Sequence, residues 1–259
     1  MVSRRNFLKG TMAITGLAAL GLYESGSDLP SGKLILCPIS KKLLLCVAGV
    51  NGKSKDYLPY FADKLGEDFN VYLTELRNRG IAGVDNCARD LVQIEQNLRE
   101  TLGLDNVVYV AHSMGMNVAA RTRKFSDSKV NGYYGCAAYP SIGDTQTESE
   151  DIEKRGLRQA GLDLVSRLNF GPVGAPLKEH VFEEPVRFAV PGNDEVLNTN
   201  NPQVLERFET YFKRNPNAST RVFDGVNHCF NYKRKDYSPF NKDNPDLLVD
   251  DIKNFADGV

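Results

Sequence analysis

A five-residue segment in the middle of the chain has the pattern of a nucleophilic serine. It reads Ala111, His112, Ser113, Met114 and Gly115, with a small residue two positions before the serine and another two positions after it. Bulky side chains at those two positions would collide with neighbouring backbone in a sharp turn from a strand into a helix. The spacing therefore predicts a turn that presents the serine hydroxyl group for attack on an acyl carbonyl carbon.

A serine hydroxyl needs a general base within hydrogen-bonding distance, and the chain offers three histidines for this role. His112 is next to the serine in sequence and is expected to point away from it. His180 lies in a stretch without a strand pattern, whereas His228 follows the last predicted strand on a loop expected to return to the top of the sheet. We predict that His228 is the base; the alternative is a loop histidine with a purely structural hydrogen bond.

The imidazole in turn needs a carboxylate that selects its tautomer and stabilises its positive form. Two adjacent carboxylates, Asp194 and Glu195, leave a predicted strand through a turn. We predict Asp194 as the acid and keep Glu195 as the alternative; the structural interpretation is a turn aspartate or a helix cap. The chain order Ser113, Asp194, His228 is that of α/β-hydrolases and differs from the orders of the chymotrypsin and subtilisin folds.

Attack on a carbonyl carbon creates an oxyanion, which needs hydrogen-bond donors already in place. The backbone N–H of Met114, at the start of the helix after the serine, is the first predicted donor. The second is expected from the glycine-containing loop 48–52, where we assign it to the backbone N–H of Val50. The alternative for this loop is a plain turn.

Apolar runs alternate with helical patterns along the rest of the chain. The predicted strands are residues 34–37, 43–48, 70–74, 107–111, 132–137, 186–190 and 220–223. The predicted helices are residues 56–65, 87–102, 117–124, 204–213 and 245–255. This alternation predicts an α/β protein with a doubly wound, mostly parallel sheet.

One long stretch, residues 140–184, has no convincing strand pattern. Residues 147–168 look helical and are followed by a segment rich in glycine and proline. We predict that about residues 141–185 form a small helical cap insertion over the top of the sheet, within a single domain that spans residues 33–259. Substrate specificity would then depend on this cap and on the pocket beneath it.

Residues 1–32 are predicted to be an export signal and linker, with no part in the fold. A basic start is followed by a modestly apolar stretch, residues 11–23, and then by a polar one. Residues 3–9, with the pair Arg4 and Arg5, resemble the twin-arginine motif read by the Tat export machinery. We expect export across the bacterial inner membrane to a periplasmic or secreted location, with membrane contact only if the signal is left uncleaved.

The charge balance argues against a nucleic-acid partner. Lys and Arg number 32 and Asp and Glu number 33, which gives a net charge of -1 without a basic stripe. The five cysteines have no CxxC or Cys/His ligand spacing, so no metal site is predicted. Cys46 and Cys136 lie in apolar runs and are predicted to be buried.

After the signal, the chain resembles the α/β-hydrolase superfamily. The resemblance rests on segments 48–50, 111–115 and 191–194 and on His228, and residues 75–80 are similar to a turn common in the superfamily. Ala48 is a departure, since many members have a histidine at that place before the glycine.

The resemblance implies a serine hydrolase that acts through an acyl-enzyme on Ser113, with a small-molecule acyl substrate and no metal or organic cofactor. Carboxylic esters are the first candidate substrates, followed by thioesters and amides. Two other functions fit the same residues: an acyltransferase, in which an alcohol replaces water, and a non-catalytic binding protein with a hydrolase fold. Loss of the serine, the acid or the histidine would favour the binding protein.

Overall fold

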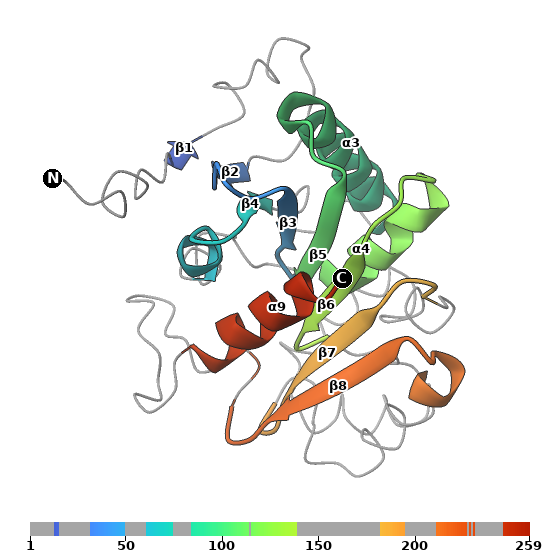
Figure 1. The fold of residues 1–259 in the computed structure, drawn as a ribbon. Coiled ribbons are helices and arrows are strands. Elements are labelled where there is room, and N and C mark those ends of the chain that lie inside the picture. The colour runs from blue at the N-terminus through green and yellow to red at the C-terminus, as the bar shows by residue number, and fades with distance from the viewer. Residues whose placement is uncertain are drawn as a thin grey trace, which may run out of the picture.

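Within the described residues, the computed structural model is built around one sheet with helices on both faces (Figure 1). The structure describes residues 32–49, 61–74, 84–113, 115–138, 182–194, 211–226, 228, 230 and 246–259, and the backbone of residues 13–15. Eight strands lie in the order β1-β2-β4-β3-β5-β6-β7-β8. They are β1 (Ala13–Thr15), β2 (Gly32–Ile35), β3 (Lys42–Val47), β4 (Asn70–Thr74), β5 (Asn106–His112), β6 (Gly132–Cys136), β7 (Val186–Pro191) and β8 (Ala218–Phe223).

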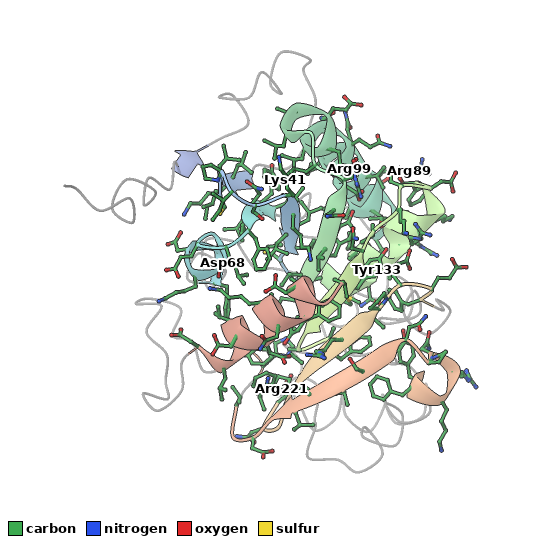
Figure 2. All side chains as sticks on the ribbon, in the orientation of Figure 1. Lys41, Asp68, Arg89, Arg99, Tyr133 and Arg221 are labelled. Atoms are coloured by element: carbon green, nitrogen blue, oxygen red, sulfur yellow. The ribbon has the colours of Figure 1, made fainter. Side chains whose placement is uncertain are left out.

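The strands from β4 to β8 in this order are all parallel, and β2 pairs antiparallel with β4. A parallel strand covered on both faces is apolar along its length, because neither side meets water. Residues 43–47 of β3 fit this rule, since none of their surface is exposed. Charged residues such as Lys41 and Asp68, labelled in Figure 2, are exposed instead. The predicted doubly wound, mostly parallel sheet is confirmed.

The helices cover opposite faces of the sheet. Helices α3 (Val84–Leu102) and α4 (Gly115–Arg121), followed by the 3-10 turn η3 (Thr122–Lys124), lie on one face, and α9 (Leu247–Asp257) lies on the other.

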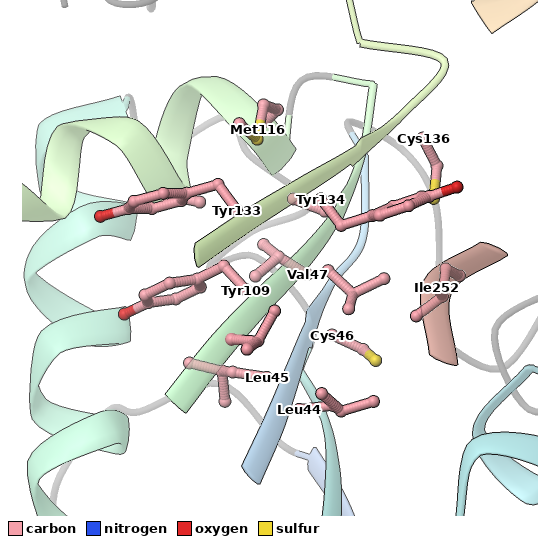
Figure 3. Close-up of a cluster of buried hydrophobic side chains, with 14 of the residues drawn as sticks. Leu44, Leu45, Cys46, Val47, Tyr109, Met116, Tyr133, Tyr134, Cys136 and Ile252 are labelled. Carbon is pink, nitrogen blue, oxygen red and sulfur yellow. The ribbon is translucent and has the colours of Figure 1, made fainter. Parts of the chain in front are cut away.

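Consecutive residues of a strand point to opposite faces, and two neighbouring tyrosines of β6 follow this rule (Figure 3). Tyr133 stacks on Tyr109 on the side of α3, with 5.5 Å between ring centroids. Tyr134 points the other way and donates a hydrogen bond of 2.6 Å to Asp251 of α9. The core therefore has two layers, one on each side of the sheet.

The register of the parallel strands brings their carboxyl ends to one edge. His112 at the end of β5 is opposite Cys136 at the end of β6. Pro191 at the end of β7 is opposite Phe223 at the end of β8. Residues that follow β5, β7 and β8 are therefore presented at the same edge, where ligands of open α/β sheets bind.

All seven predicted strands are present, with ends that differ by up to two residues. The predicted helices 87–102, 117–124 and 245–255 correspond to α3, α4 with η3, and α9. Residues 61–65 and 211–214 are helical and belong to the other two predicted helices. The predicted cap lies outside the described residues except for residues 182–185.

The signal segment differs from the prediction in one respect. We expected residues 1–32 to have no part in the fold, but β1 pairs antiparallel with β2, with Ala13 opposite Ile35 and Thr15 opposite Lys33. The structure therefore differs from the expectation at these three residues and at Gly32, the first residue of β2. The physical reason is that β2 has a second edge of backbone donors and acceptors, which accepts another strand. None of the described helices is long and apolar enough to cross a membrane.

Candidate active site

Ser113 occupies the turn between β5 and α4, as the pentapeptide predicted. Its φ angle is 51°, in the left-handed region that residues other than glycine seldom adopt. Its backbone N–H donates a 2.8 Å hydrogen bond to the carbonyl of Cys136, so the neighbouring strand β6 stabilises the turn. The side chain is half-buried. The backbone thus presents Ser113 at the carboxyl edge of the sheet.

Two glycines make this sharp turn possible. A Cβ atom on Gly115 would lie 2.7 Å from the backbone oxygens of both Val47 and Ala48, closer than real Cβ contacts come. A Cβ atom on Gly49 would lie 3.2 Å from the Cβ atom of Ser113. The serine turn and the start of the loop after β3 are therefore in direct contact. Position 115 requires a residue without a side chain, and a side chain at position 49 would displace its neighbours by a few tenths of an ångström.

Asp194 and His228 form a hydrogen-bonded pair beyond β7 and β8. The Nδ1 atom of His228 lies 2.7 Å from Oδ2 of Asp194. The carboxylate of Asp194 is fully buried, whereas 15% of the His228 side chain is exposed. A carboxylate in this position selects the tautomer with hydrogen on Nδ1 and leaves Nε2 as the proton acceptor.

Backbone hydrogen bonds explain why these two loops meet. After β7, the N–H of Gly192 donates to the carbonyl of Phe223 at 2.8 Å, and the N–H of Asn193 donates to the carbonyl of Val226 at 2.9 Å. The turn that carries the aspartate is thereby fixed against the end of β8 and the residues after it. The side chain of Asp194 then points to His228, two positions beyond Val226.

His112 makes a contact that the sequence did not predict. The residue is only 6% exposed, and its Nε2 atom lies 3.0 Å from the backbone carbonyl oxygen of His228. The two imidazole rings meet edge to face, with 5.0 Å between centroids. The only sequence signal for this contact was the position of His112 immediately before the candidate nucleophile.

Residues in the left-handed region gather at this edge of the sheet. Among the described non-glycine residues, φ is positive at Ser113, at Ala137 (48°) and at Phe230 (53°). Ala137 directly follows β6, and Phe230 lies two positions after His228. Such conformations each cost about 1–3 kcal/mol and cluster at functional sites, so their location is a second reason to place the site here.

Burial dominates the electrostatics of the site. Burial, and after it the positive charge of a protonated His228, lower the pKa of His112 to about 3, against smaller opposing contributions from their hydrogen bond and from Asp194. His112 is therefore neutral at physiological pH. In the described part of the chain, no group of three or more His, Cys, Asp or Glu side chains could hold a metal ion.

Several predicted site residues lie outside the described residues. These are the two predicted oxyanion donors Val50 and Met114, the alternative acid Glu195 and the third histidine His180. The buried cysteines were predicted well: Cys46 has no exposed surface and Cys136 is 6% exposed.

The N-terminal residues match a known signal family. Residues 1–21 match the model of the TAT (twin-arginine translocation) pathway signal sequence. The prediction of the twin-arginine signal is confirmed, and such a signal supports export across the inner membrane. No curated protein sequence matches the chain.

Several solved structures are similar to this one. An esterase of Pyrococcus furiosus, Pf2001, has a TM-score of 0.63 and 14% identity, over 100% of this chain and 94% of that chain. The esterase Est1E of Butyrivibrio proteoclasticus has a TM-score of 0.59 and 12% identity, over 94% and 96%. A dienelactone hydrolase of Anabaena variabilis has a TM-score of 0.59 and 14% identity, over 95% and 96%. The chain is therefore a protein of the α/β-hydrolase fold that begins with a twin-arginine signal sequence.

Proposed function

We propose that this protein is an exported serine hydrolase that cleaves carboxylic esters, with Ser113 as nucleophile, His228 as general base and Asp194 as the acid. The observation that carries the proposal is the 2.7 Å hydrogen bond between Nδ1 of His228 and the buried carboxylate of Asp194. It lies at the sheet edge where Ser113 adopts its left-handed turn. A plain turn aspartate or a solvated loop histidine would not require this pairing.

The proposed chemistry has two steps. In the first, Oγ of Ser113 attacks the acyl carbonyl carbon while Nε2 of His228 takes the hydroxyl proton. The tetrahedral intermediate collapses, the carbon–oxygen bond to the alcohol breaks, and the imidazolium gives its proton to the departing oxygen. In the second, water attacks the acyl-enzyme by the same proton transfers, which releases the carboxylic acid and restores the serine. Asp194 stabilises the imidazolium in both steps.

The oxyanion of each intermediate would accept hydrogen bonds from the backbone N–H groups of Met114 and Val50. Gly49 supports this arrangement, because its missing side chain lets the loop after β3 approach Ser113 closely. The reaction needs no metal ion or organic cofactor, since the serine, the histidine and backbone donors supply every group.

The neighbours in fold agree with this proposal. Two of the three similar structures are named esterases and the third is a dienelactone hydrolase. The signal sequence directs the chain to the Tat export machinery, so we place the enzyme in the periplasm or outside the cell. A small-molecule acyl compound is the expected substrate, and esters take precedence over thioesters and amides.

The direct test is covalent labelling of the purified protein with a fluorophosphonate, which reacts with activated serines. We expect one modified peptide, containing Ser113, and no labelling of the Ser113→Ala variant. Ser128→Ala is the matched control and should label like the unaltered protein. A folded protein that stays unlabelled and cleaves no p-nitrophenyl ester would refute the hydrolase and favour a binding protein. Labelling accompanied by acyl transfer to added alcohols in preference to water would identify an acyltransferase instead.

A further inference from the structure

The contact between His112 and His228 assigns the hydrogen on the buried imidazole. The backbone carbonyl oxygen of His228 can only accept a hydrogen bond, so Nε2 of His112, at 3.0 Å, must be the donor. His112 is therefore the tautomer with hydrogen on Nε2. Its Nδ1 atom faces Gly49, where a Cβ atom would lie 3.2 Å from it.

This hydrogen bond acts on the same residue that Asp194 orients. Asp194 fixes the ring of His228 through Nδ1, and His112 fixes its backbone through the carbonyl oxygen. An imidazole restrained at both points has little freedom to swing about its Cα–Cβ bond. The anchor is the residue before Ser113, so the turn of the nucleophile and the loop of the base are joined directly.

A neutral donor is required at this position. The ring of His112 meets the ring of His228 with 5.0 Å between centroids, so a permanent positive charge there would disfavour the imidazolium that forms in the reaction. Burial keeps His112 neutral, because it lowers the pKa of the imidazole to about 3. A lysine or arginine could donate the same hydrogen bond but would carry this unfavourable charge.

The geometry points to His112 as a positioning residue that aligns His228 with Ser113 through its hydrogen bond to the His228 carbonyl. This role rests on the proposed function of those two residues. His112 touches neither substrate nor reacting atoms in this scheme. It acts through the base, and its removal should change the rate of the chemical step and leave substrate binding nearly unchanged.

Two substitutions of equal length separate positioning from packing. His112→Gln retains an N–H donor at about the distance of Nε2, whereas His112→Met fills similar space without a donor. We expect kcat for a p-nitrophenyl ester to fall roughly 10- to 100-fold in the Met variant with KM within about 2-fold, because small displacements of a catalytic group are costly. The Gln variant should recover kcat to within about 3-fold of the unaltered protein. Equal kcat values in the two variants would overturn the inference.

A second readout does not depend on activity. A proton on Nδ1 of a histidine bonded to a carboxylate gives a proton NMR resonance far downfield of the backbone amides. His228→Ala would identify the resonance by its loss, and we expect it to be weakened or absent in His112→Met and retained in His112→Gln.

The two readouts distinguish the possible failures. If the unaltered protein neither labels nor cleaves esters but the resonance still depends on position 112, the hydrolase proposal fails and the positioning of His228 is upheld. If the unaltered protein is active and both kcat and the resonance are unchanged in His112→Met, the positioning role is refuted and the hydrolase proposal is retained.

Discussion

Gly115 packs so closely against Ala48 that a Cβ atom at position 115 would lie 2.7 Å from the Ala48 carbonyl oxygen. This contact joins the first residue of α4, just after the candidate nucleophile turn, to the residue that follows β3. The added Cβ atom would meet backbone carbonyl oxygens, so rotation of a neighbouring side chain could not relieve the collision. The closeness of the two segments therefore depends on glycine.

The substitution Gly115→Ala should destabilise the fold by about 1–3 kcal/mol, since the added methyl group forces backbone to move. The same shift should disturb the serine turn and slow fluorophosphonate labelling. Urea unfolding measures the first effect. Gly258→Ala is the control, because its Cβ atom would meet only ordinary contacts at 3.5 Å or more, and its stability should change by less than about 0.5 kcal/mol. Equal midpoints for the two variants would contradict this prediction.

The substitution Asp194→Asn should lower kcat by about 10⁴-fold, because the amide no longer selects the productive tautomer of His228 or stabilises the imidazolium. Steady-state hydrolysis of a p-nitrophenyl ester is the measurement. Asp224→Asn, in the exposed turn after β8, is the matched control and should retain full activity. Retention of kcat within about 10-fold in Asp194→Asn would show that another carboxylate is the acid.

Acid should weaken the fold through His112. Its pKa is about 3 in the folded protein against 6.5 as the ordinary value, so the unfolded chain binds a proton between these values that the folded protein does not. The contribution of this residue to the free energy of unfolding is therefore fully present above about pH 6.5 and is lost as the pH falls toward 3. At pH 5 the free energy of unfolding should be lower by about 2 kcal/mol. The titratable groups nearest the ring are His228 and Asp194, and both are unchanged in His112→Gln.

Urea unfolding at about pH 7.5 and about pH 5 tests this expectation. The loss of stability between the two values should be smaller in His112→Gln than in the unaltered protein by about 2 kcal/mol. Identical losses in the two proteins would mean that His112 is protonated in the folded state at pH 5.

The buried carboxylate of Asp251 should be a large source of stability away from the candidate site. It accepts hydrogen bonds from Arg187 at 3.0 Å, from Arg221 at 2.7 Å and from Tyr134 at 2.6 Å, and thus joins α9 to strands β6, β7 and β8. The arginines are partly exposed, so Asp251→Asn should cost about 2–3 kcal/mol, less than for a fully buried pair. The exposed neighbour provides the control Asp250→Asn, with little change expected. A thermal or urea midpoint is the readout, and an unchanged midpoint in Asp251→Asn would count against the network.

Export should depend on the paired arginines. Changing both Arg4 and Arg5 to lysine keeps the charge but removes the guanidinium groups that the twin-arginine pathway reads, so the precursor should accumulate inside the cell. Cell fractionation followed by immunoblotting measures the distribution. Lys9→Arg, which leaves the pair intact, should be exported normally. Unimpaired export of the double variant would indicate a different route.

Much of the fold was predictable from local pattern. A buried parallel strand is apolar throughout, so the run at residues 107–111 identified β5, which the structure extends by one residue at each end. The serine turn was equally clear, because its small residues are required within five consecutive positions. The strand ends were less certain, since hydrogen bonds to neighbouring strands decide where a strand stops.

The sequence by itself determined which residues could do chemistry, because residue type and position relative to a strand end are local properties. Only the tertiary structure decided which of them meet. Asp194 and His228 are 34 positions apart, and His112 and the carbonyl of His228 are 116 positions apart. Such distances depend on strand order and on the course of the loops, which no local pattern encodes. The role of His112 became visible only because the sheet places the end of β5 beside the loop that follows β8.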